Sequence, residues 1–411
     1  MTAWAPFSTA KRLQLRALLS MEPRGLDELT RARAQMSGRS VSLSALEALC
    51  AAEPGFAGRL FDRIVPSVLS HARALLAHDS PALDIHPVGA ARRTSLTRSD
   101  AAGWVAHMVL GTLPELGMLH PDVDFARLLA GELPSQHARL RCVLAYFDRI
   151  ADGAPAGRLV VERVVTPPRT ALEWAMDPSP LSGLTVDARG TVEDAHAHLQ
   201  VDFANEFLGG GVLRKGCVQE EIRFAVAPEH MAAMILSPRM RADEAIVMRG
   251  AERFARATGY ASTLAYAGPF NDPVARLADG SADVDFVAID AVDYRRADAA
   301  AQYGEEAMLR ELNKARAGFL RDARNLPVAT GNWGCGAFRG DPALKAALQW
   351  VAASAEGRAV RYCTFGDARV GELARFAERA RARFATAGDL WKKLRASAGL
   401  GGDGLFERLA G

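Results

Sequence analysis

The 411-residue chain is poor in cysteine and carries no excess of either charge. Its five cysteines lie far apart with no C-x-x-C pair, which argues against a disulfide framework or a zinc site and favours a reducing compartment. Lysine and arginine number 50 and aspartate and glutamate 48, so no global field can hold a polyanion by counterion release alone. Any polyanionic ligand must therefore be held locally.

Long apolar runs are also missing. No segment approaches the roughly 18 apolar residues that span a bilayer, and the N-terminal sequence lacks the apolar core and cleavage site of a signal peptide. We therefore expect a soluble, cytoplasmic protein with no membrane contact. Because 49% of the residues are hydrophobic and the length suits two or three domains of roughly 100–200 residues each, we expect packed cores rather than disorder.

The N-terminal part of the chain has the apolar spacing of amphipathic helices. Over residues 41–147, leucines and other apolar side chains recur every three or four positions. Helices are predicted over 100–113 and 136–150. The segment 91–98, ARRTSLTR, is expected to interrupt the helical series.

Beyond this helical part, the pattern changes to alternating strands and helices. The segment 152–157, DGAPAG, has the composition of a linker, and the β-branched run 159–165 after it predicts a strand. Further strands are predicted at 184–186, 199–203, 285–291 and 360–365, and helices at 220–224, 303–325 and 341–355. Such alternation indicates a layered α/β domain with a mostly parallel or mixed sheet.

The segment 201–224 combines a strand end, a glycine run and two carboxylates. The strand delivers Asp202 and Asn205 to a loop, in which Gly209–Gly211 let successive N–H groups approach one anion. Glu220-Glu221 then open a helix, where the macrodipole alone would favour them. Because helical neighbours point about 100° apart, the two carboxylates cannot make the same contact. The segment therefore suits a site for an anionic glycosyl ligand.

A second glycine-rich loop, ATGNWGCGAFRGD over 329–341, lies between a predicted strand and a predicted helix. Its glycines allow close backbone approach, and unpaired N–H groups at the start of the following helix are expected to form a phosphate site. The loop is neither G-x-G-x-x-G nor G-x-x-x-x-G-K-[ST], because no lysine follows its last glycine. A nicotinamide dehydrogenase or a P-loop nucleotidase is therefore disfavoured.

Together, these loops resemble the signature of poly(ADP-ribose) glycohydrolases. GGG-x7-QEE runs from Gly209 to Glu221, and VDFAN, TGY, VDFVAIDA, ELNKA, VATGNWGCGAF and TFGD occur in the family's order. The resemblance covers 41–394, as in the eukaryotic-type two-part enzymes. It implies a macrodomain-like, three-layer α/β/α fold with a mixed central sheet, preceded by an all-helical accessory domain. We therefore expect a helical domain over 1–157 and a catalytic macrodomain over 158–411.

The resemblance also implies catalytic roles by position. Glu221 matches the family's general acid, and Asp202 matches an acid that supports the catalytic loop. Glu220 and Asn205 match residues that hold the hydroxyls of the terminal ribose.

Further positions match residues around the base and the diphosphate. Tyr260 and Phe365 match aromatic residues that enclose the adenine and the distal ribose, and Val192-Glu193 match the pair that reads the adenine edge. The remaining expected substrate-binding residues are Gly209, Gly210, Gly211, Gln219, Asn332, Gly334, Cys335, Gly336, Ala337 and Phe338.

The activity that the resemblance implies is cleavage of the ribose–ribose bonds of poly(ADP-ribose), as in the DNA damage response. Glu221 would protonate the leaving hydroxyl, the oxocarbenium-like sugar would be stabilised by the diphosphate, and water would attack with Glu221 as base. No metal or cofactor is expected. The expected partners are poly(ADP-ribose), ADP-ribose and poly(ADP-ribosyl)ated proteins. We expect the protein to be a monomer and not to recognise nucleic acid directly.

Two other functions stay open at this point. A macrodomain can be an ADP-ribose reader without turnover, although a second buried carboxylate would then cost free energy for no purpose. The chain could also remove single ADP-ribose units from protein side chains. Among other candidates, His196 and His198 are expected to be exposed loop residues rather than metal ligands, and Cys217 is not expected to be a nucleophile.

Overall fold

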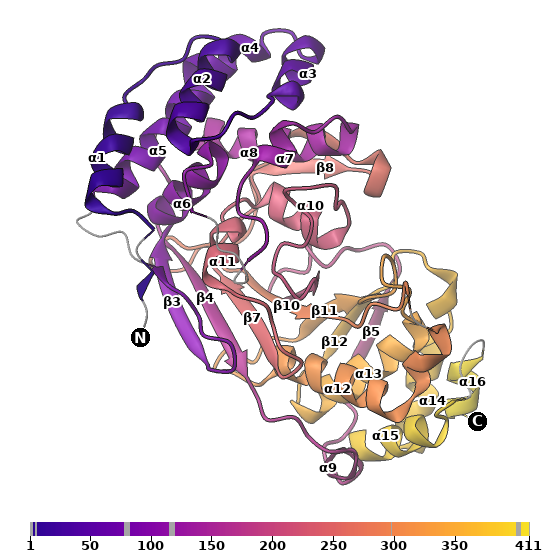
Figure 1. Ribbon diagram of the computed structural model, residues 1–411. Coiled ribbons are helices and arrows are strands. Elements are labelled where there is room, and N and C mark those ends of the chain that lie inside the picture. The colour runs from indigo at the N-terminus through magenta and orange to yellow at the C-terminus, as the bar shows by residue number, and fades with distance from the viewer. Residues whose placement is uncertain are drawn as a thin grey trace.

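The computed structural model describes residues 3–4, 6–77, 83–114, 120–296, 298–399 and 404–410. The helices of the N-terminal half lie above one side of a large sheet, in indigo to magenta in Figure 1. They are α1 (Thr9–Leu18), α2 (Leu26–Ser37), α3 (Ser44–Ala52), α4 (Phe56–Arg59), α5 (Val65–Ala77), α6 (Arg98–Leu110), α7 (Ala126–Leu129) and α8 (Pro134–Arg149), with a π-helical turn at Leu60–Ile64 before α5. The helices predicted over 100–113 and 136–150 are therefore confirmed as α6 and α8.

The central sheet has eight strands among the described residues, in the order β3-β4-β7-β10-β6-β11-β12-β5. Their bounds are β3 (Arg92–Thr97), β4 (Arg158–Val165), β5 (Leu184–Asp187), β6 (Leu199–Ala204), β7 (Glu244–Arg249), β10 (Asp285–Asp290), β11 (Val328–Gly331) and β12 (Val360–Cys363). The strands from β3 to β10 pair antiparallel, whereas those from β10 to β5 pair parallel. The expected mixed sheet is confirmed.

Both faces of the sheet are covered, because its strands alternate apolar side chains between two cores. In β10, Phe286 and Ala288 join the core under the N-terminal helices, whereas Val287 and Ile289 join the opposite core. The first core also takes in α11 (His230–Leu236), while α10 (Gln219–Val226) packs on α8. The opposite core holds α12 (Glu305–Phe319), α13 (Pro342–Ala355), α14 (Leu373–Arg383), α15 (Ala387–Ala396) and α16 (Leu405–Ala410). The three-layer α/β/α arrangement is therefore confirmed.

Smaller elements complete the fold. A hairpin of β8 (Ala255–Thr258) and β9 (Ala265–Pro269) lies against α8, and β1 (Ala3–Trp4) pairs with β2 (Leu83–Asp84). The short helix α9 spans Ala171–Ala175, and 3₁₀ turns lie at Ala261–Thr263, Ala299–Tyr303 and Ala368–Val370.

Two strands of the central sheet were not predicted, nor were the short strands β1, β2, β8 and β9. The segment 91–98, expected to be a break, forms β3, which pairs antiparallel with β4 at the edge of the sheet. The N-terminal half is therefore not wholly helical. β7 was missed because a short apolar run such as EAIVMR cannot be told from buried helix by periodicity alone. The predicted domain boundary between residues 157 and 158 stays a prediction.

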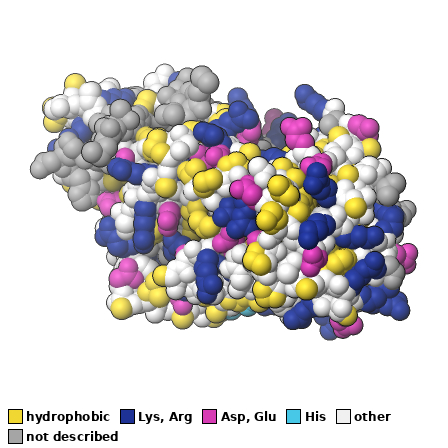
Figure 2. Space-filling view, turned by 90° about the horizontal axis from the view of Figure 1, so that it is seen from below, with side chains coloured by type: hydrophobic (Ala, Val, Ile, Leu, Met, Phe, Trp, Pro, Cys, Tyr) yellow, Lys and Arg dark blue, Asp and Glu magenta, His cyan; other side chains and the backbone are white. Residues whose placement is uncertain are grey.

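Two helices were also predicted to extend beyond their observed C-terminal ends. The helix expected to reach 325 ends at Phe319 as α12, and the one expected to reach 113 ends at Leu110, where Gly111 takes a φ of +67° and closes the helix. No helix of the described residues has the length and apolarity needed to cross a bilayer. Figure 2 shows basic and acidic side chains interspersed over the face seen from below, in keeping with the balanced charge.

Candidate functional site

The carboxylates of the glycine-rich segment meet at the carboxyl end of β6. Asp202 lies on β6, and α10 begins at Gln219 and places Glu220 and Glu221 in its first turn. Glu221 caps the helix, because its Oε2 accepts the backbone N–H of Val218 at 2.8 Å. The helix start itself therefore brings the predicted acid to the end of the strand.

The backbone of the glycine run turns toward these carboxylates. The N–H of Gly209 donates to Glu220 Oε1 at 2.7 Å, and the N–H of Gly211 donates to Glu221 Oε1 at 2.9 Å. Glu220 Oε2 also accepts the N–H of Asn205 at 2.9 Å. The N–H groups of Gly209 and Gly211, expected to point at a ligand anion, are used here on the protein's own carboxylates.

Gly210 explains why the loop needs glycine. Its φ is +53°, in the region that side chains other than glycine rarely adopt. A Cβ built there would lie 2.5 Å from Glu220 Oε2 and 2.6 Å from Glu221 Oε1. The loop can approach both carboxylates only because this residue has no side chain.

The carboxylates are shielded from water. Asp202, Glu220 and Glu221 expose 0%, 2% and 6% of their surface. Burial, followed by the charges of Asp202 and Glu221, raises the pKa of Glu220 well above its ordinary value. Burial, followed by the charge of Glu221, does the same to the pKa of Asp202, whose two oxygens find no hydrogen-bond partner among the described residues. Both shifts favour the neutral form of the carboxyl groups.

The predicted adenine-edge pair lies beside the start of α10. Gln219 Nε2 donates to Glu193 Oε1 at 3.0 Å, while its Oε1 accepts the N–H of Phe203 at 2.9 Å. Val192 is fully buried in a small cluster of apolar residues that includes Cys363. The structure thus brings Val192, Glu193 and Gln219 to one place.

Two exposed aromatic side chains flank the site. Tyr260 and Phe365 remain 53% and 47% exposed, unusual for large apolar groups. Burial of its hydroxyl raises the pKa of Tyr260, with the backbone N–H of Gln219 acting in the opposite direction, so the phenol lies at the start of α10. Phe365 has a φ of +54°, a strained value for an aromatic residue. Its ring lies over Gly331, where a Cβ would approach it to 2.8 Å.

The second glycine-rich loop leaves several backbone N–H groups without acceptors. In the described part of the chain, those of Gly336, Ala337 and Phe338 donate to no protein atom. The side chain of Asn332 is used internally, since it accepts the Tyr362 hydroxyl at 3.0 Å and donates to the Thr364 carbonyl at 3.2 Å. The N–H groups of 336–338, in the exposed part of the loop, are therefore open to an anion.

The expectation of a phosphate site at the start of the following helix is wrong. Asp341 Oδ1 accepts the N–H groups of Ala343 and Leu344 at 2.7 and 3.1 Å. Pro342 begins α13 and has no N–H to offer. The first turn of α13 is therefore satisfied by its own capping carboxylate, which would also repel a phosphate.

Comparisons with known proteins identify both halves. The helical domain of poly(ADP-ribose) glycohydrolase matches residues 52–163, and the macro domain fold of the same enzyme matches 171–372. Poly(ADP-ribose) glycohydrolase 1 of Arabidopsis thaliana is 31% identical in an alignment of 432 positions, which spans 82% of this chain and 78% of the relative. This chain belongs to the poly(ADP-ribose) glycohydrolase family.

Other relatives are longer than the region they share with this member of the poly(ADP-ribose) glycohydrolase family. Probable poly(ADP-ribose) glycohydrolase 2 of Arabidopsis thaliana is 34% identical over 63% of this chain and 59% of its own length. Poly(ADP-ribose) glycohydrolase 1 of Caenorhabditis elegans is 34% identical over 68% of this chain and 37% of its own length.

The other candidate residues do not form a site in this glycohydrolase-family chain. His196 is exposed in a loop, and His198 Nδ1 lies 2.8 Å from the His196 carbonyl. No group of three His, Cys, Asp or Glu side chains suited to a metal ion occurs among the described residues. Burial, with the charge of Glu221, raises the pKa of Cys217, which disfavours its thiolate.

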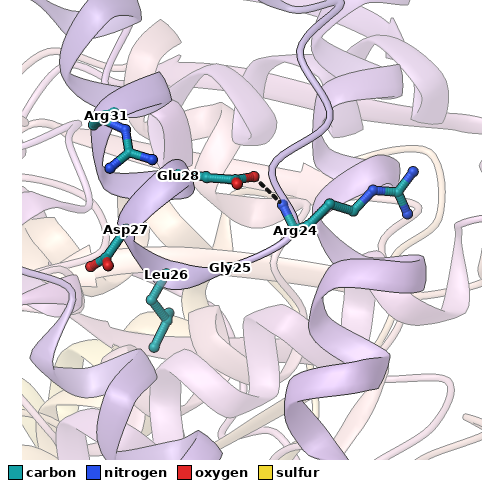
Figure 3. A pocket seen from close by; sticks show the side chains of 6 residues that line it. All are labelled: Arg24, Gly25, Leu26, Asp27, Glu28 and Arg31. Atoms are coloured by element: carbon teal, nitrogen blue, oxygen red, sulfur yellow. Dashed lines mark hydrogen bonds between the residues drawn. The ribbon is translucent and has the colours of Figure 1, made fainter.

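Figure 3 shows a surface hollow of about 350 Å³ at the start of α2, lined by residues 24–28 and Arg31. The backbone N–H of Arg24 donates to Glu28 there at 2.8 Å. The hollow shares no residue with the two glycine-rich loops that carry the glycohydrolase signature. The hydrogen bond within it lies at the start of α2.

The sequence did not indicate which residues of the N-terminal half reach the glycine loop. His120, Gln136 and Arg139 all bond its carbonyl groups. They follow no motif, and the contacts join residues more than 70 positions apart.

Proposed function

We propose that this chain hydrolyses the ribose–ribose O-glycosidic bonds of poly(ADP-ribose) and releases ADP-ribose. The observation that carries the proposal is the buried group of Asp202, Glu220 and Glu221 beneath the glycine run, in a chain of the poly(ADP-ribose) glycohydrolase family. The names of the relatives support the same activity.

Glu221 acts as the general acid in this proposal. It donates its proton to the ribose oxygen that leaves, and the bond from that oxygen to the anomeric carbon breaks. The oxocarbenium-like sugar is stabilised by the adjoining diphosphate. Water then attacks the anomeric carbon, and Glu221, now ionised, takes the proton from the water.

The neighbouring carboxyl groups support this role. Glu220 and Asn205 hold the hydroxyls of the terminal ribose, and Asp202 supports the loop. Burial raises the pKa values of Glu220 and Asp202, which favours the protonated form of both groups. Because the substrate carries a diphosphate, a cluster with less negative charge repels it less.

The rest of the substrate lies across the edge of the sheet in this proposal. The N–H groups of 336–338 hold the diphosphate, since they have no acceptor among the described residues. Tyr260 and Phe365 enclose the adenine and the distal ribose, which fits the exposure of both rings. Val192 and Glu193 read the adenine edge beside Gln219.

The proposal has three finer parts. The chain acts as a monomer on polymer attached to proteins, and a helical domain over 1–157 precedes a catalytic domain over 158–411. A cytoplasmic location fits the five cysteines, all of which are free thiols. Size-exclusion chromatography with light scattering tests the monomer, since a stable dimer would contradict it.

Glu221→Gln tests the catalytic assignment. The variant is expected to lose turnover of poly(ADP-ribose) while keeping its affinity for ADP-ribose, because the amide keeps the shape but has no proton of suitable acidity. Glu229→Gln is the matched control: Glu229 is also buried, but it pairs with Arg98 away from the loop. Turnover close to wild type in Glu221→Gln would overturn the assignment.

An assay on two substrates separates the proposal from its alternatives. Poly(ADP-ribose) and a protein carrying a single ADP-ribose unit are each incubated with the chain. A glycohydrolase shortens the polymer, a hydrolase of single units clears only the second substrate, and a reader binds ADP-ribose without altering either.

A further inference from the structure

The glycine loop is held from outside by the N-terminal half. Four carbonyl groups of the loop face the N-terminal half and accept hydrogen bonds from side chains of that half. His120 Nε2 donates to the Leu208 carbonyl at 2.8 Å, and Gln136 Nε2 donates to the Arg214 carbonyl at 3.0 Å. The other two carbonyls, together with that of Arg214, are bound by Arg139.

Arg139 is the centre of this arrangement. Its guanidinium donates to the carbonyls of Gly211 at 3.4 Å, Val212, and Arg214 at 3.1 Å. Its Nε donates to the Ser135 carbonyl one turn earlier in α8, which fixes the plane of the guanidinium fork. One side chain thus spans most of the outer edge of the loop.

The two sides of the loop divide the backbone groups between them. The carbonyls of Gly211 and Val212 face Arg139, whereas the N–H groups of Gly209 and Gly211 face Glu220 and Glu221. The Leu208 carbonyl held by His120 and the N–H of Gly209 belong to one planar peptide unit, so fixing the first fixes the direction of the second. The carbonyl and the N–H of Gly211 belong to adjacent peptide units joined at its Cα, so the bond to Arg139 restrains that N–H through the φ and ψ angles of this one residue. The hold on the outside of the loop therefore sets the geometry on the inside.

Arg139 is an unusual residue for a purely structural contact. It is fully buried, yet it forms no ion pair with a carboxylate in the described part of the chain. Burying a guanidinium without such a partner is costly, and apolar packing would stabilise an interface at lower cost. Glu221 lies close enough for its charge to act on Arg139.

We propose that Arg139 is a positioning residue for the reaction. It holds the glycine loop so that the hydrogen bond between the N–H of Gly211 and Glu221 keeps its geometry. The N-terminal half would then supply part of the catalytic geometry rather than only complete the core. This inference rests on the proposed glycohydrolase function for its kinetic test, although not for its structural one.

The experiment compares Arg139→Met with Arg141→Met. Arg141 lies two residues further along α8 and is also buried, but it pairs with Glu53 at 3.0 Å and stacks on Phe56 and Tyr266, away from the loop. Both variants lose a buried arginine from the same helix, so both should lose thermal stability. Only Arg139→Met should change the loop.

The expected kinetic result is a fall of roughly 10²-fold in kcat for Arg139→Met, because a displaced catalytic group commonly costs that much. Its Kd for ADP-ribose should stay within about threefold of wild type. Arg139→Lys should recover part of kcat, because the ammonium group can still donate to the loop carbonyls although it lacks the planar fork of arginine. Arg141→Met should keep kcat. Equal kcat values for the two methionine variants would overturn the inference.

Hydrogen exchange tests the same inference without turnover. Peptides covering 208–217 should exchange faster in Arg139→Met than in wild type, and remain unchanged in Arg141→Met. If the wild-type chain hydrolyses no polymer, the proposed function fails while this measurement still decides the role of Arg139. Unchanged exchange of the loop in Arg139→Met would overturn the positioning role even in an active enzyme.

Discussion

The two glycine-rich loops follow neighbouring parallel strands, β6 and β11, and so reach the same edge of the sheet, but they are held in different ways. The first is fixed from outside by side chains of the N-terminal half, chiefly Arg139, and from inside by the carboxylates of α10. The second is fixed by its own half of the molecule. Asn332 ties it to Tyr362 and Thr364.

Beneath the second loop lies a buried group of charged side chains. Lys345 contacts Glu311, and its Nζ lies 4.0 Å from the centre of the Trp333 ring. Glu311 in turn accepts the N–H of Val292 at 3.1 Å, and Trp333 Nε1 donates to the Ile289 carbonyl at 2.8 Å. The loop is therefore anchored to the sheet and to α13.

The different anchoring of the two loops matches their different proposed roles, catalysis for the first loop and binding of the diphosphate for the second. The first loop contacts the proposed acid, Glu221 of α10, and its shape depends on side chains of the N-terminal half. The second carries the proposed diphosphate contacts and is anchored to the sheet and, through Glu311 and Lys345, to α12 and α13. Changes in the first loop should therefore act on kcat, and changes in the second on the affinity for ADP-ribose.

The largest expected effect comes from adding one methyl group to each loop. In Gly210→Ala the new Cβ would meet both carboxylates, so Glu221 must move and kcat should fall by roughly 10²-fold. In Gly334→Ala, with a φ of +72° and a Cβ 2.4 Å from that of Ala291, backbone strain of roughly 1–2 kcal/mol should instead raise the Kd for ADP-ribose about tenfold. Steady-state kinetics measures kcat of the first variant, and calorimetry measures the Kd of the second for ADP-ribose.

Gly58→Ala is the control for this pair. Gly58 lies in α4 with ordinary backbone geometry, and its nearest neighbour would lie 3.8 Å from the new Cβ. It should change neither value. A loss of affinity in Gly210→Ala with kcat intact would contradict the division between the loops.

A smaller effect is expected from the anchor of the second loop. Lys345→Met leaves Glu311 buried with one partner fewer, so the free energy of unfolding should fall by about 3 kcal/mol. The Kd for ADP-ribose should rise about tenfold as the loop loosens, with kcat at saturating substrate within about threefold of wild type. Chemical denaturation and calorimetry provide the measurements.

Lys392→Met serves as the comparison, since Lys392 pairs with Asp389 at 3.1 Å on the surface and such pairs contribute at most about 1 kcal/mol. If kcat collapsed in Lys345→Met while ADP-ribose still bound normally, the second loop would take part in the chemistry.

The inside of the first loop could be predicted from the sequence, whereas its outside could not. A strand end, three glycines and a Glu-Glu pair at a helix start lie within 24 residues, so local rules place them together. The contact of Arg139 with Gly211 spans 72 positions, and an arginine on an amphipathic helix normally suggests a solvent-facing residue. Only tertiary packing turns that residue inward.

The start of α13 shows a different limit of local rules. The glycines of 331–340 and the helix after them were recognised, and both are present. Asp341, however, is the N-cap of the helix, and its carboxylate accepts the first N–H groups that a phosphate would need. Which rule applies depends on the rotamer of one side chain.

The smallest expected effect concerns His120, which holds the first loop at Leu208. Its Nε2 donates to that carbonyl, while its Nδ1 accepts the N–H of Asp122 at 3.2 Å, an arrangement that requires the neutral ring. Burial lowers the pKa of His120 below its ordinary 6.5, with Asp122 opposing and Arg214 adding to the shift.

A histidine with a lowered pKa contributes stability above pH 6.5, its unfolded value, and this contribution is lost as the pH falls through the folded value. The stability advantage of wild type over His120→Gln, whose amide can still donate but cannot titrate, should therefore shrink below pH 6.5. We expect a change on the order of 1 kcal/mol in denaturation curves between pH 5 and 8, with kcat falling in parallel as the first loop loosens. The affinity for ADP-ribose, to which the proposed contacts of the second loop contribute, should hardly move over the same range. A parallel pH dependence of stability in the two proteins would show that acid reaches the loop through some other group.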